Sequence, residues 1–215
     1  MSTPEPLTLT SLPLFPLGTV LFPDGVLPLR VFEVRYLDMV GKCQQTGAPF
    51  GVVALAQGNE VRTPGAAPDQ LETVGTLAHI RHLERPQPGL MLLQCHGEQR
   101  FRIEHHHLLK HGLWVADVSL LAPDAAVPVP DDLRHVASAL RQLHASLRVQ
   151  SPGAPVPEAA AARYEDSGWV ANRWCELLPL SLPTRQHLMS LDSPLLRLEL
   201  VADMLARTGI GVGKA

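Results

Sequence analysis

The sequence has few aromatic residues, few cysteines and no excess of positive charge. Phe, Trp and Tyr make up 5% of 215 residues, so a core must be built mainly from Leu, Val and Ala. Lys and Arg number 18 against 21 Asp and Glu, a net charge of −3. Nucleic-acid binders usually carry a basic excess or a dense basic stripe. The composition therefore favours a folded domain and argues against a nucleic-acid partner.

Disulfides, a leader peptide and membrane spans are also not expected. The three cysteines, Cys43, Cys95 and Cys175, are far apart and form no Cys-x-x-Cys pair, which favours a reducing compartment. The first ten residues lack the basic and apolar regions of a signal peptide. No apolar run approaches the roughly 20 residues that cross a bilayer. We expect a cytoplasmic protein without a membrane partner.

The usual motifs of catalysis are missing as well. A Walker A loop needs Gly-x-x-x-x-Gly-Lys-Ser/Thr, whose backbone amides hold phosphates, and the nearest match, Gly213-Lys214-Ala215, lacks the hydroxyl residue. No Gly-x-Ser-x-Gly elbow is present. The cysteines lie in apolar patterns, which favour burial over nucleophilic chemistry. We therefore predict no catalytic residue and no cofactor.

Three consecutive histidines, His105 to His107, are the one cluster that suggests a metal. In a strand, neighbouring side chains point to opposite faces, so His105 and His107 alone would converge. Two ligands do not complete a zinc site. Solvated histidines are the favoured interpretation, and no metal is predicted.

The first half of the chain is typical of short strands with one helix. The pattern predicts a helix over Glu33–Gln45 that ends at Gly47, a loop over 57–73, and a turn at His96-Gly97. Pro13 and Pro16 place the first strand at a sheet edge or at strand ends. Close spacing favours a mostly antiparallel, barrel-like sheet. The predicted strands are Leu12–Leu17, Val26–Phe32, Pro49–Leu55, Val74–Leu83, Leu90–Cys95, Gln99–Ile103 and Trp114–Leu121.

The second half is typical of helices that follow a proline-rich linker over 123–130. The predicted N-caps are Asp131, Ser167 and Ser193, with Pro194 in the first turn of the last helix and Gly209 at its end. A short helix is predicted over Leu182–Leu191. Strands first and helices second indicate an α+β protein, divided into a β-rich part over 1–124 and a helical part over 125–215.

Several spaced motifs resemble the Lon protease N-terminal, or substrate-binding, domain family. Residues 12–41 read LPLFPLGTVLFPDGVLPLRVFEVRYLDMVG, and PFGVV follows at 49–53. Val-Gly-Thr-Leu-Ala at 74–78 and Gly97 with Arg-Phe-Arg at 100–102 continue the match in the family's order. The resemblance runs from about Ser11 to Thr208, and the opening segment is its most specific part.

The resemblance implies a twisted pseudo-barrel of the PUA-like kind followed by a helical bundle. It also implies contact with unfolded substrates. The chain departs from full-length Lon proteases, because without a Walker A loop we expect neither an ATPase nor a peptidase in it. We therefore expect a stand-alone, non-catalytic protein-recognition module. Its partner would be a polypeptide, bound as an unfolded apolar segment or as a folded protein, and a homodimer is possible. An apolar groove or a free sheet edge is the expected binding surface.

Candidate partner contacts come from the family-like motif and from tryptophans, which are enriched in binding hot spots. A second interpretation of Glu33 is structural, as a partner for an arginine that holds the helix to the barrel. The candidates are Arg30, Phe32, Glu33, Arg35, Tyr36, Trp114 and Trp169.

Two other functions stay open at this point. RNA binding, by analogy with other PUA-like folds, would need a basic stripe across the barrel. A hydrolase is the least favoured and would need a Cys–His or Ser–His pair within hydrogen-bond reach. The stripe would be made from Arg81, Arg85, Arg100, Arg102 and Lys110.

Overall fold

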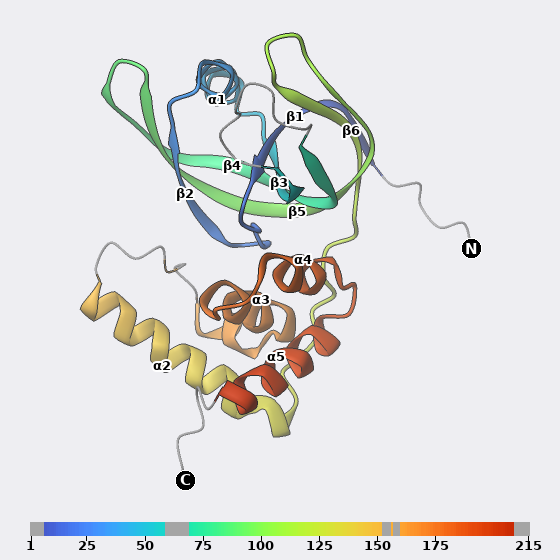
Figure 1. The fold of residues 1–215 in the computed structure, drawn as a ribbon. Coiled ribbons are helices and arrows are strands. Elements are labelled where there is room, and N and C mark those ends of the chain that lie inside the picture. The colour runs from blue at the N-terminus through green and yellow to red at the C-terminus, as the bar shows by residue number, and fades with distance from the viewer. Residues whose placement is uncertain (1–6, 59–68, 152–155, 157–159, 209–215) are drawn as a thin grey trace. The chain divides into compact units, whose positions relative to one another are not determined.

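The computed structural model describes residues 7–58, 69–151, 156 and 160–208. The chain forms two compact units, Met1–Pro123 (the barrel unit) and Asp124–Ala215 (the helical unit). The division lies next to the one expected after residue 124. Strands fill the first unit and helices the second, which confirms the α+β class (Figure 1).

The described part of the barrel unit forms a mostly antiparallel sheet in the order β2-β5-β4-β3-β1-β6, and a second pairing of β5 with β6 curls it into a pseudo-barrel (Figure 1). The exception is β1, which runs parallel to β3. The barrel-like prediction is confirmed. The elements are β1 (Thr8–Leu17), β2 (Val26–Val31), α1 (Val34–Thr46), β3 (Phe50–Gln57), β4 (Gln70–Gln87), β5 (Leu90–Leu108) and β6 (Trp114–Leu120).

The turn predicted at His96-Gly97 is wrong, because both residues lie inside the continuous strand β5. A Cβ on Gly97 would overlap the carbonyl oxygen of Phe22. The Gly97 amide donates to Gly25 at 2.9 Å, and its carbonyl accepts from Asp24 at 2.8 Å. The glycine therefore allows the chain before β2 to cross closely over β5, and a single strand replaces the two predicted ones.

Of the two positions predicted for the first strand, a sheet edge or strand ends, the sheet edge is wrong. In β1, Pro13 pairs with β6 and Pro16 pairs with β3, and Leu14 has a partner on both sides. The first half of β1 is therefore hydrogen-bonded to β6 alone, and the second half to β3 alone. A proline can then turn its nitrogen to the unbonded side without removing a ladder hydrogen bond. Because the pairing partner of β1 changes along its length, each proline has one side of the strand without a neighbour, as it would at a sheet edge.

Helix α1 covers the larger of two apolar cores in the barrel unit. It begins shortly after β2 and ends at Gly47, which has the left-handed φ of 67° that favours glycine at this position. Tyr36 and Met39 pack into the core, and the Tyr36 ring stacks on Phe15 with centroids 4.1 Å apart. The prediction of one short helix in this half is confirmed.

The predicted loop over 57–73 is too long at its far end, because β4 already begins at Gln70. Residues 59–68 of that loop lie outside the described residues, as do Gly209 and the tail that follows it.

The helical unit contains four α-helices and two short 3-10 segments among its described residues (Figure 1). Ser193 caps the last helix as predicted, through its Oγ and the Leu196 amide at 3.2 Å. Asp166, and not Ser167, caps α3, because its carboxylate accepts from the Trp169 amide at 2.7 Å. The N-cap predicted at Asp131 is wrong, because Asp131 begins a 3-10 turn and Leu133 stands at the N-cap of α2. The elements are η1 (Asp131–Leu133), α2 (Arg134–Gln150), η2 (Ala161–Glu165), α3 (Ser167–Leu177), α4 (Leu182–Ser190) and α5 (Pro194–Thr208).

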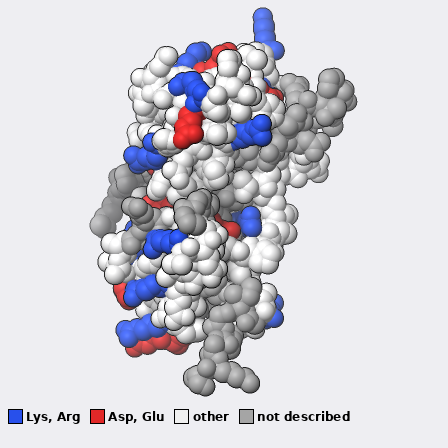
Figure 2. All heavy atoms as spheres, turned by 90° about the vertical axis from the view of Figure 1, so that its left-hand side faces the viewer, with Lys and Arg blue, Asp and Glu red and all other residues white. Residues whose placement is uncertain are grey.

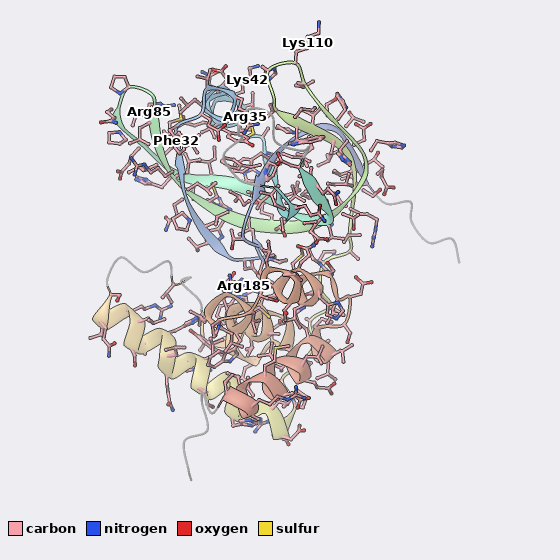
Figure 3. The ribbon with its side chains drawn as sticks, viewed as in Figure 1. Phe32, Arg35, Lys42, Arg85, Lys110 and Arg185 are labelled. Carbon is pink, nitrogen blue, oxygen red and sulfur yellow. The ribbon has the colours of Figure 1, made fainter. Side chains whose placement is uncertain are left out.

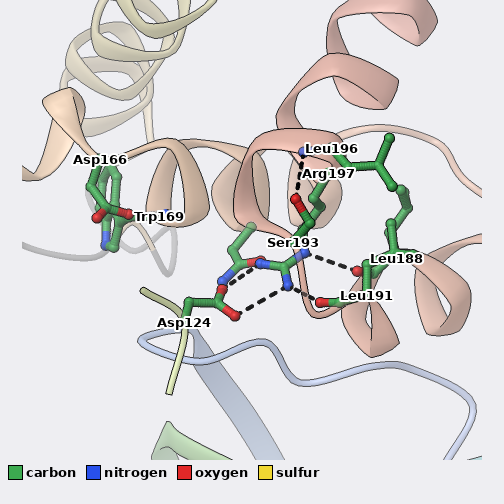
Figure 4. Close-up of polar contacts among 9 residues, drawn as sticks. Asp124, Asp166, Trp169, Leu188, Leu191, Ser193, Leu196 and Arg197 are labelled. Carbon is green, nitrogen blue, oxygen red and sulfur yellow. Dashed lines mark hydrogen bonds and ion pairs between the residues drawn. The ribbon is translucent and has the colours of Figure 1, made fainter. Parts of the chain in front are cut away.

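The proline-rich linker predicted over 123–130 is attached to the helical unit. Arg197 of α5, 1% exposed, donates to Asp124 at 2.5 Å and to Asn172 at 2.9 Å (Figure 4). It also donates to the carbonyl oxygens of Leu188 and Leu191. A buried guanidinium needs this number of acceptors to offset its lost hydration. Asp124, near the start of the segment, is therefore bonded to a buried residue of the helical unit.

Candidate functional site

A pocket of about 550 Å³ in the barrel unit, here called the α1 pocket, is the main candidate site. Its floor is apolar and comes from α1, β6 and the β5–β6 turn, through Met39, Leu109, Leu113 and Val115. Its rim is polar. Pockets of this size hold small molecules or anchoring side chains. The polar rim consists of Ser11, Arg35, Asp38, Lys42, His107 and His111.

Arg35 fixes one wall of the α1 pocket (Figure 3). It pairs with Glu33 at 2.8 Å and donates to the carbonyl oxygen of Gly112, in the β5–β6 turn, at 2.7 Å. Its guanidinium carbon also lies 4.5 Å from the centroid of the Tyr36 ring, within cation–π range. Glu33 thus pairs with Arg35, and Arg35 in turn connects the start of α1 to the β5–β6 turn.

A second hollow of about 290 Å³, here called the β2 groove, lies along β2 and the start of α1. Arg30, Phe32, Glu33 and Tyr36 all contribute to its lining. Phe32 is 54% exposed, a large fraction for an aromatic side chain (Figure 3). The structure therefore brings together four of the residues that the sequence singled out.

The other three candidates lie apart from this groove. Arg35 lines the α1 pocket, and Trp114 is half-buried with its ring 5.3 Å from that of His106. Trp169 is 4% exposed and packs against Tyr164 and His144 in the helical unit. Because Trp169 is a core residue, it offers no surface to a partner, and that expectation is corrected. Tyr36 is buried too, at 3%, and supports the groove from beneath.

The cysteines and histidines form no reactive group within the described residues. All three cysteines are free and buried, and burial raises the pKa of Cys95 and of Cys175 to about 12. Thiols in this state are poor nucleophiles at neutral pH. His105 to His107 are exposed on β5, and the described residues contain no group of three or more side chains placed to hold a metal ion.

The basic residues do not form the stripe that RNA binding would need. Arg100 is 4% exposed, which removes the central member from the surface. Arg81 lies 3.8 Å from Glu98, and Arg85 donates to Gln44 at 2.8 Å. On the face shown in Figure 2, described Lys and Arg residues are separated by uncharged and acidic ones. No described helix is long and apolar enough to cross a membrane.

The floor and most of the rim of the α1 pocket were not predicted from the sequence. A signal was present in the segment between β5 and β6, where Leu109 and Leu113 enclose a turn with Gly112 at a φ of 85°. Apolar residues in a turn indicate that the turn packs on something. Lys42 and His107 lack any such signal, because only the fold brings them to one rim.

A barrel-like sheet followed by helices defines the class of fold, and comparison with known proteins gives its family. The ATP-dependent protease La (LON) substrate-binding domain family matches residues 11–207, so the chain belongs to that family. A structure described as a Lon N-terminal domain protein from Xanthomonas campestris is similar, with 32% identity, a TM-score of 0.69, and coverage of 91% of this chain and 98% of that one.

Other relatives agree with this family. Lon protease 2 of Herpetosiphon aurantiacus is 30% identical over 187 residues, which cover 86% of this chain but 22% of that protein. The N-terminal domain of Lon protease from the Mycobacterium avium complex shares the fold, with a TM-score of 0.59 at 18% identity, and coverage of 91% of this chain and 98% of that one. The chain thus spans about a fifth of the length of the curated Lon proteases that it matches over most of its residues.

Proposed function

We propose that this protein is a non-catalytic recognition module that binds exposed apolar segments of polypeptide at the barrel unit. The observation that carries the proposal is the α1 pocket, with its volume of about 550 Å³ and its apolar floor. An apolar side chain that leaves water for such a pocket gains on the order of 1.5–3 kcal/mol. Membership of a substrate-binding family supports the same function.

The apolar surface continues beyond the pocket. Val34, on the rim of the α1 pocket, is 72% exposed, and Phe32, in the β2 groove, is 54% exposed. Neighbouring exposed apolar residues of this kind can contact several apolar side chains of one flexible segment. An unfolded segment loses conformational entropy when it binds, so we expect weak affinities, on the order of micromolar.

The test is a substitution of Val34 by aspartate. Val34 is the first residue of α1, where a carboxylate is favoured by the helix dipole, so the fold should not be weakened. Binding of a labelled, permanently unfolded protein should weaken by about fivefold to tenfold, because the pocket rim loses apolar surface and gains a charge. Fluorescence anisotropy measures this change.

The matched control is Val149→Asp. Val149 is 81% exposed on α2 and lies in the helical unit, in the lining of neither hollow. This substitution should leave the affinity unchanged. Equal effects of the two substitutions, or no effect of either, would contradict the placement of binding at the α1 pocket.

A further inference from the structure

One side of β2 has a free backbone edge, which plays no part in the α1 pocket. In the described sheet, β2 pairs with β5 on one side, and no described strand lies on its other side. An exposed strand edge presents unpaired N–H and C=O groups, and such edges are templates for another strand. Most of the barrel avoids this condition, because β5 pairs with β6 and closes the sheet.

One contact shows which residues of β2 direct their backbone N–H and C=O groups toward β5. The Gly97 amide donates to the Gly25 carbonyl at 2.9 Å, so bonded pairs alternate from there along the ladder. Leu27, Leu29 and Val31 therefore turn their backbone groups toward β5. The backbone groups of the intervening residues face the free side. These residues are Val26, Pro28 and Arg30.

The side chains of β2 alternate in the same way. Leu29 and Val31 pack on the barrel core, whereas Pro28 and Arg30 are more exposed, and all four contribute to the lining of the β2 groove. Leu92, opposite Arg30 on β5, is 37% exposed. A strand added beside β2 would continue this pattern. Every second side chain would lie on the face of Leu29 and Val31, and the others would lie beside Arg30 on the opposite face.

We propose that β2 binds an extended polypeptide segment as an added antiparallel strand, and that the segment alternates apolar residues with acidic ones. The apolar side chains fill the β2 groove, beside Phe15 and Leu17. A carboxylate lies opposite Arg30, which forms no ion pair with another described residue. The inference rests on the proposed polypeptide-binding function and deepens it, by giving the bound segment a conformation and a charge pattern.

Pro28 argues for a foreign segment over a second copy of this chain. The antiparallel register that pairs all of Val26–Arg30 with a second β2 would set Pro28 against Pro28. Neither proline has an N–H to donate, so that pair would form no hydrogen bond. A different segment loses one bond at this position and keeps the bonds at Val26 and Arg30.

The experiment uses the full chain and a fluorescein-labelled peptide, Val-Glu-Val-Glu-Val-Glu-Val, with Val-Lys-Val-Lys-Val-Lys-Val as its partner probe. Arg30→Glu should weaken binding of the glutamate peptide about tenfold and strengthen binding of the lysine peptide. Arg102→Glu is the matched control, because Arg102 is exposed on β5 and lies in neither hollow. It should change neither affinity beyond twofold or so.

N-methylation of the peptide tests the backbone pairing itself. In the proposed register, the glutamate amides face β2 and the valine amides face away. Methyl groups on the glutamate amides should abolish binding, and methyl groups on the valine amides should leave it largely intact. Equal effects at both sets of amides, or equal effects of Arg30→Glu and Arg102→Glu, would overturn the inference. If neither peptide binds while an unfolded protein does, the added strand is wrong and the proposed function stands.

Discussion

At the scale of single residues, His144 is the histidine that links the stability of this fold to acidic pH. It is 2% exposed, and its Nδ1 lies 2.9 Å from the hydroxyl oxygen of Tyr164. Burial, with smaller effects of Arg148 and Arg173, lowers its pKa from 6.5 to about 4. The folded helical unit therefore holds this histidine in its neutral form, whereas the unfolded chain protonates it more readily.

This linkage predicts acid destabilisation. Well above pH 6.5 the histidine is neutral in both states, and its effect grows as the pH falls from 6.5 to about 4, where the unfolded chain binds the additional proton. The free energy of unfolding should fall by on the order of 3 kcal/mol over that window from this group. Urea denaturation at several pH values measures it, and His144→Gln should remove this part of the slope. An unchanged slope in the variant would refute the assignment.

Arg197 gives a second prediction at this scale. Replacing it by methionine removes the ion pair with the Asp124 carboxylate, 17% exposed, and should cost about 3–5 kcal/mol. Asp124→Asn keeps a carbonyl oxygen for the guanidinium and should cost about 1–2 kcal/mol. Thermal or chemical unfolding compares the two. A larger loss for Asp124→Asn than for Arg197→Met would show that this network does not anchor the segment.

Which single residues would be functional was the least predictable part of the molecule. Trp169 and Tyr36 were chosen for their residue type or their motif, and both are buried. Burial of an aromatic residue depends on which elements meet, and local sequence does not encode that. Glu33 and Arg35 were predicted better, because two residues that close in sequence can pair without knowledge of the rest of the fold.

At the scale of elements, the apolar periodicity of the sequence predicted where helices and strands lie. It did not predict whether neighbouring strand segments form one continuous strand. The sequence predicts two strands in place of β5 because glycine is common in turns. The reason for Gly97 is a contact with Phe22, 75 residues earlier in the chain, and no local pattern reports it. The prolines of β1 misled in the same way, since the change of pairing partner at Leu14 is a property of the sheet.

Gly97→Ala tests this account of β5. The new Cβ would overlap the Phe22 carbonyl oxygen, so backbone must move, and we expect a loss of at least 2 kcal/mol or so in the free energy of unfolding. Gly41→Ala is the control. Gly41 lies in α1, where an added methyl group would point into open space, and alanine there should stabilise by up to about 1 kcal/mol. Similar effects at both positions would contradict the close crossing.

At the scale of the whole molecule, the family and the α+β class were predictable from spaced motifs and from the order of strands and helices. The location of the hollows was not. The α1 pocket is assembled from β1, α1 and the β5–β6 region, and its rim residues are separated by as many as 100 positions, from Ser11 to His111. Part of the lining of the β2 groove was easier to predict, since the candidate residues that line it lie in one continuous motif.

The proposed function predicts a particular salt dependence. Burial of apolar surface is little affected by salt, whereas binding to nucleic-acid phosphates weakens steeply as salt rises. With a net charge of −3 and no exposed basic stripe among the described residues on the face shown, affinity for polypeptide should change less than threefold or so between about 50 and 200 mM salt.

The most direct measurement is a titration of this protein into a labelled, permanently unfolded polypeptide, beside the folded form of the same polypeptide and a labelled RNA oligonucleotide, at those two salt concentrations. We predict saturable binding of the unfolded polypeptide alone, nearly independent of salt. Binding of the RNA alone, lost steeply with salt, or equal binding of the folded and unfolded polypeptides, would contradict recognition of exposed apolar segments.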